Sequence, residues 1–140
     1  MYEYYNDQTT LATIETIKGK VDTINKFKDI RKTESISAQK DIIHAVSSIA
    51  CDIINLLETL PPRSFASKSI EGFCDDWHNY RFVLQTAYDN RSNMLIGKAG
   101  ELEAYKCIEG IKTYLNHILV VIEKQQNFDR LDYEFDNSEK

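Results

Sequence analysis

Apolar residues recur every three or four positions along most of this chain, which is the spacing of one face of an α-helix. The clearest stripe runs from Ile42 to Leu60 without a break. Pro61 and Pro62 follow it at once, and the residue before a proline avoids helical backbone angles. We therefore predict a helix from Ser37 to Leu60 that ends at a corner of the fold.

Three further stripes predict three further helices. The first covers Gln8 to Lys32, the second covers Ser69 to Asp89, and the last runs to about Gln126. Their connections are short and polar, as in an antiparallel bundle. The predicted fold class is therefore all-α, with four principal helices packed as an antiparallel bundle.

The start of the last helix has two alternatives. A turn at 89–93 would let Ser92 cap the helix. A turn at 97–100 would instead lengthen the preceding helix. The first alternative is favoured because four small residues then follow at heptad spacing, as expected where two helices approach closely. These residues are Gly97, Gly100, Ala104 and Cys107.

Residues 128–140 differ from the rest of the chain. They are acidic, carry interspersed aromatic residues and have no helical stripe of their own. We predict a single bundle domain over residues 1–127, followed by a mobile acidic tail over 128–140.

Composition narrows the class of protein. With 140 residues, 42% hydrophobic and 28% charged, the chain can bury one core. Its start lacks the basic and apolar segments of a signal peptide, and the run 118–122 is too short to span a bilayer. Three widely spaced cysteines indicate reduced thiols. We expect a cytoplasmic protein without a membrane segment, and its many Ile, Lys, Asn and Tyr codons fit an AT-rich bacterial, phage or viral genome.

The charge pattern bears on the partner. The net charge is −5 and the isoelectric point is about 5.2, which disfavours nucleic acid as a partner. One local stretch is basic and is the candidate patch for that alternative. It contains Lys18, Lys26, Lys28, Arg31 and Lys32.

No reactive motif stands out. Asp41–His44 and Asp75–His78 share the spacing of bundle metal ligands, but they lie off the apolar stripes. Their different distances from the Pro61 corner also separate them by roughly 20 Å along an antiparallel pair. Cys74 lies one turn from His78, yet nothing nearby orients such a pair. We predict no catalytic residue, no metal, no cofactor and no enzymatic activity.

The functional hypothesis is a small protein-binding module, such as an inhibitor, an immunity or anti-defence protein, or an accessory subunit. It would act by stoichiometric contact with a partner whose surface is basic. Candidate contact residues are the aromatic side chains away from the apolar stripes: Phe82, Phe128, Tyr133 and Phe135. The alternative is a nucleic-acid or nucleotide binder that uses the basic stretch. The sequence leaves open whether the protein is a monomer or a homo-oligomer.

Overall fold

The computed structural model describes residues 5–32, 35–62, 64–90 and 97–138, with side chains for all of these except 64–65, 90, 97–102 and 132–138. The described residues form four α-helices and one short 3-10 helix, and no strand occurs among them, which confirms the all-α prediction. The elements are α1 (Gln8–Asn25), η1 (Ile30–Lys32), α2 (Ile36–Leu57), α3 (Ser64–Asn90) and α4 (Gly97–Ser138).

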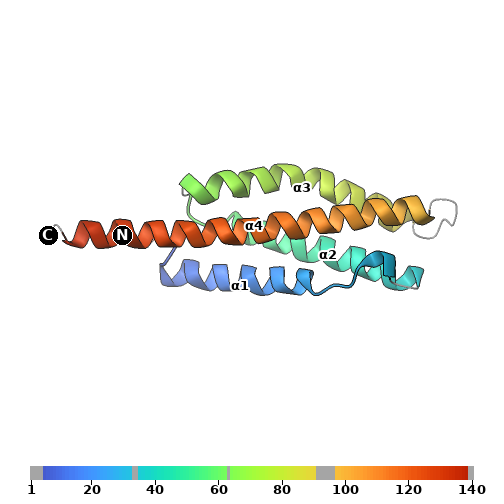
Figure 1. Ribbon diagram of the computed structural model, residues 1–140, viewed down its shortest axis with the longest axis horizontal. Helices are drawn as coiled ribbons and strands as arrows, with labels where there is room; N and C mark the ends of the chain where they lie inside the picture. The colour runs from blue at the N-terminus through green and yellow to red at the C-terminus, as the bar shows by residue number, and fades with distance from the viewer. Residues whose placement is uncertain (1–4, 33–34, 63, 91–96, 139–140) are drawn as a thin grey trace.

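Successive α-helices run in opposite directions, so that α1 and α3 run from left to right and α2 and α4 from right to left in Figure 1. Each packs against the next, and α4 also contacts α1 and η1, so the bundle closes around one core. The core side chains come from the predicted stripes. The most completely buried ones include Ile14, Ile17 and Ile24 of α1, Ile43 and Ile53 of α2, Phe73 and Leu84 of α3, and Ile111 and Leu115 of α4.

Helix α2 matches the prediction closely. It begins after Ser35, whose hydroxyl oxygen accepts a hydrogen bond from the Ala38 amide at 2.9 Å, and it ends four residues before Pro61. Ile53 is fully buried at the centre of its apolar face. The apolar stripe therefore predicted both the helix and the face of it that is buried.

The predicted end of the first helix at Lys32 is wrong. Helix α1 stops at Asn25, and the chain then turns through η1. Side chains of other helices bind backbone carbonyl groups of this segment in place of helical hydrogen bonds. Lys112 Nζ donates to the Phe27 carbonyl and Gln39 Nε2 donates to the Ile30 carbonyl, both at 3.3 Å. The apolar stripe continued past the helix because Ile30 is still buried.

The start of α4 decides against one of the two turns predicted before the last helix. Residues 97–100 are helical, so the alternative turn at that position is wrong. The favoured turn at 89–93 overlaps α3, which includes Asp89 and Asn90, and its remaining part, with the proposed cap Ser92, lies outside the described residues. Helix α3 also starts earlier than predicted, at Ser64.

The predicted end of the last helix at about Gln126 is wrong, because the described part of the predicted tail, residues 128–138, is helical. Helix α4 continues to Ser138 and runs past the ends of α1 and α3 (Figure 1). Once a helix exists, each added residue gains a hydrogen bond without a new nucleation cost. The sequence after Gly110 contains neither glycine nor proline to stop this elongation. Within the described ranges, no helix combines the length and apolar character needed to cross a membrane.

Candidate functional site

The part of α4 that leaves the bundle is the first candidate site. We call residues 126–138 the α4 extension. Its thirteen residues span roughly 20 Å at the helical rise. Phe128 and Leu131, three positions apart and thus on neighbouring sites of one helix face, are 45% and 58% exposed. Single exposed apolar side chains are normal on a protein surface, but exposed apolar residues that lie next to one another form a patch of the kind that contacts other molecules.

A buried polar cluster anchors the base of the α4 extension. Gln125 Oε1 accepts a hydrogen bond from the Ala66 amide at 3.3 Å, and Gln125 Nε2 donates to Asp129 Oδ1 at 2.9 Å. Both side chains are fully buried. The Ala66 amide belongs to the first turn of α3, where backbone donors have no helical acceptor. The cluster therefore fixes the start of α3 against α4 at the point where α4 leaves the bundle.

The residues before α1 also contact the base of the α4 extension. Gln126 Nε2 donates to the Tyr5 carbonyl at 3.2 Å, and Asn6 Nδ2 donates to the Gln126 carbonyl at 2.9 Å. Tyr5 has no exposed surface. The direction of the α4 extension is thus fixed by contacts from two separate parts of the chain.

The structure does not bring the predicted contact residues together. Phe82 is 71% exposed on α3, close to Tyr80, whose carbonyl accepts a hydrogen bond from Cys107 Sγ at 3.4 Å. Phe82 therefore lies near the level of Cys107, and Phe128 lies about 30 Å further along α4 at 1.5 Å per residue. The two side chains belong to different parts of the surface.

Tyr133 and Phe135 lie within α4, but their side chains lie outside the described residues. Leu131 was missed by the sequence interpretation. Its signal was its spacing, three residues after Phe128 and four before Phe135. That spacing forms one apolar face only in a helix, and the sequence pattern predicts a tail for this segment.

The predicted basic patch is divided and largely paired. Its residues do not share one helix, because Arg31 and Lys32 lie in η1. Lys18 pairs with Glu15 at 3.3 Å, and Lys26 pairs with Asp22 at 2.9 Å. Lys28 and Lys32 are exposed. Paired charges of this kind attract phosphate groups less strongly than an uncompensated basic face.

Arg31 has a structural role. Its guanidinium bonds Asp29 at 2.7 Å and stacks on the Tyr105 ring at 3.5 Å from the centroid. The hydrogen bond from Arg31 keeps the pKa of the Asp29 carboxyl below its usual value. These contacts attach η1 to α4, as a cation stacked on an aromatic face does elsewhere.

A pocket at the corner between α2 and α3 is the second candidate site. We call it the corner pocket. It encloses about 270 Å³ beside Pro61 and Pro62. Its apolar wall comes from Leu57, Leu60 and Ile70.

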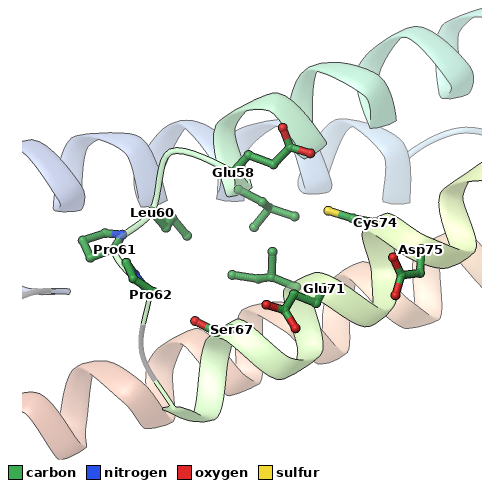
Figure 2. A pocket seen from close by; sticks show the side chains of 10 residues that line it. Glu58, Leu60, Pro61, Pro62, Ser67, Glu71, Cys74 and Asp75 are labelled. Atoms are coloured by element: carbon green, nitrogen blue, oxygen red, sulfur yellow. The ribbon is translucent and has the colours of Figure 1, made fainter.

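Three carboxylates surround the corner pocket. Figure 2 shows Glu71 and Asp75 along α3 and Glu58 on the opposite side, at the end of α2. All three are exposed, and none makes an ion pair with another residue in the described ranges. Cys74 lies between them. Its thiol pKa is raised, first by burial and then by the negative charges of Glu58, Asp75 and Glu71.

The sequence interpretation missed this carboxylate set. The sequence relates Asp75 only to His78, one helical turn away. Glu58 lines the same pocket as Asp75 only because the chain folds back at the two prolines and brings α3 against α2. His44 and His78 are exposed, as the stripes indicated. Among the residues with described positions, no three His, Cys, Asp or Glu side chains are arranged to hold a metal ion.

Comparisons add no family to this description. No protein-family model matches the chain, and neither the curated proteins nor the solved structures include a match. The functional argument therefore depends on the two sites alone.

Proposed function

We propose that the protein is a non-enzymatic binding module that acts by stoichiometric contact with another protein through the α4 extension. The observation that carries this proposal is the exposure of Phe128 and Leu131 on a helix that continues past the bundle. A helix with apolar residues on one face commonly binds by lying in an apolar groove of its partner.

The anchoring of the extension supports this use. The Gln125–Asp129 bond and the contacts of Gln126 with Tyr5 and Asn6 orient the helix before any partner binds. A surface that is ordered in advance loses less conformational entropy on association. Affinity in such interfaces is concentrated in a few residues, aromatic side chains above all. Phe128 is the described residue that fits this role best.

The test places a photoreactive phenylalanine analogue at one of two positions in otherwise identical proteins. At position 128 we expect light-dependent coupling to a defined partner in an extract of the source cells. The analogue at position 82 serves as the matched control, because Phe82 is also an exposed aromatic residue on a helix. Mass spectrometry would then identify the coupled protein.

The recombinant partner should next be titrated with the protein. Saturation near one equivalent, and loss of binding in Phe128→Ala but not in Phe82→Ala, would support the proposal. Coupling that is equal at both positions, or an effect at strongly sub-stoichiometric amounts, would contradict it.

We also propose a cytoplasmic location. It is supported by three cysteines that are all free thiols, one of them, Cys51, exposed. A reducing compartment keeps such a thiol from forming intermolecular disulfides. Fractionation of cells that produce the tagged protein would check this location.

A further inference from the structure

We propose that the corner pocket binds the basic side chain of a lysine or arginine presented by the protein partner. This inference rests on the proposed function, because it names the chemistry of the partner that the module recognises. It starts from the pairing of an apolar wall with a rim of carboxylates.

The shape of the pocket suits one long side chain. Its volume of about 270 Å³ lies below the roughly 300–1,000 Å³ of most small-molecule sites. Leu57, Leu60 and Ile70 offer an apolar wall to a chain of methylene groups. Lysine and arginine bury such stems while their charged ends stay in polar surroundings.

The negative charges around the pocket favour an occupant with a positive charge. Glu58, Glu71 and Asp75 all line the pocket, Glu58 from the end of α2 and the other two from α3 on the opposite side (Figure 2). Two of the residues lie one helical turn apart on α3, and the third lies across the pocket at the end of α2. A cation placed between them would be attracted from two directions.

The pocket is at the same end of the bundle as the α4 extension. Its α3 wall begins with Ser67, and the neighbouring Ala66 is bonded to Gln125 at the base of the extension. A partner that engages Phe128 therefore approaches the end of the molecule that contains the pocket. The pocket would add charge specificity to the apolar contact.

A second copy of this chain is a poorer occupant. The net charge of −5 makes two copies repel each other. The charge complement of the pocket is thus better supplied by a different protein with a basic surface.

The test uses the isolated protein and two small probes of nearly the same shape. The n-butylguanidinium ion carries a positive charge, and n-butylurea is neutral. Methyl resonances of Leu57, Leu60 and Ile70 are followed by NMR during titration. We expect saturable shifts of these resonances with the cation, weaker at high salt because of screening, and much smaller shifts with the urea.

Matched variants give the charge dependence. Glu71→Gln and Asp75→Asn should each weaken binding of n-butylguanidinium by roughly two- to fivefold, as expected for a partly exposed ion pair. Glu103→Gln removes the same charge at an exposed position of α4 outside the pocket and should leave binding unchanged. Equal binding of the neutral probe, absence of shifts at the three methyl-bearing residues, or equal weakening by all three variants would overturn the proposal.

One further variant tests an occupant from this chain. Arg63 lies outside the described residues and directly follows Pro62 in the sequence. Unchanged probe binding in Arg63→Gln would support a partner's cation as the occupant, and tighter binding would overturn it in favour of Arg63. Since no partner is present in these titrations, failure of the pocket proposal leaves the coupling at position 128 unaffected, and the two proposals can fail separately.

Discussion

Three helical glycines provide a test of the packing that can be worked out atom by atom. Gly19 lies in α1, Gly72 in α3 and Gly110 in α4. A methyl group added at Gly19 would meet no atom within 4 Å, and at Gly110 it would meet the Tyr80 ring at an ordinary 3.5 Å. At Gly72 it would overlap the Tyr114 hydroxyl oxygen.

The three substitutions to alanine should therefore change the free energy of unfolding in different directions. Alanine is favoured over glycine inside a helix by about 0.5–1 kcal/mol. Gly19→Ala and Gly110→Ala should gain this amount. Gly72→Ala gains the same amount, but it must displace a ring that packs on the buried Phe73 at 5.0 Å between centroids. Overpacking of this kind costs about 1–3 kcal/mol, so we expect a net loss of roughly 1 kcal/mol.

Thermal unfolding followed by circular dichroism can measure these differences. For a chain of this length, a change of 1 kcal/mol shifts the midpoint by roughly 3 °C. We expect increases of about 2–3 °C for Gly19→Ala and Gly110→Ala and a decrease of about 3 °C for Gly72→Ala. Denaturant titration would check that the free energies follow the same order.

The double variant Gly72→Ala with Tyr114→Phe isolates the cause. Without the hydroxyl, the nearest ring atom, Cζ, would lie at 3.8 Å from the new methyl group, which is an ordinary contact. Tyr114→Phe should therefore restore the stability lost in Gly72→Ala, beyond its own effect. If Gly72→Ala is as stable as Gly19→Ala, or if the double variant shows no recovery, the packing of α3 on α4 described above is incorrect.

Three further predictions follow from burial. Because burial raises the pKa of the Cys107 thiol to about 12, iodoacetamide at pH 8 should alkylate exposed Cys51 in the folded protein and reach Cys107 only on unfolding, as followed by mass spectrometry. Ile53→Ala should lower the unfolding free energy by about 2–5 kcal/mol, while His44→Ala at an exposed site should change it by less than about 0.5 kcal/mol, both measured by denaturant titration. Asp129→Ala leaves the buried Gln125 amide without this acceptor and should cost about 1–3 kcal/mol; an unchanged thermal midpoint would contradict the anchoring of the α4 extension.

The fold class and most of the core were predictable because burial leaves a direct trace in the sequence. Stripes at helical spacing identified Ile14, Ile53 and Leu115 as interior residues, and all three are buried. The same signal misplaced the end of α1. Periodicity reports which side chains are buried, and Ile30 is buried from a 3-10 turn that happens to keep the spacing of the preceding helix.

The anchoring of the α4 extension left no apolar stripe in the sequence, because polar residues hold the base of the extension. Gln125 and Asp129 are buried through hydrogen bonds, and hydropathy gives buried polar residues the same value as surface ones. The corner pocket was invisible for another reason. Glu58 and Glu71 are thirteen residues apart in the sequence, and only the fold of the chain at the two prolines places them on one opening.

The contact of Tyr5 and Asn6 with Gln126 also has a consequence for the order in which the protein is made. The two sides of this contact are separated by about 120 residues, which a ribosome takes roughly 6–24 s to translate at 5–20 residues per second. During that time α1, α2 and α3 can pack against one another, but the face of α1 that α4 covers remains open to water. The nascent chain therefore exposes the part of the α1 apolar stripe that α4 covers until α4 has left the ribosome.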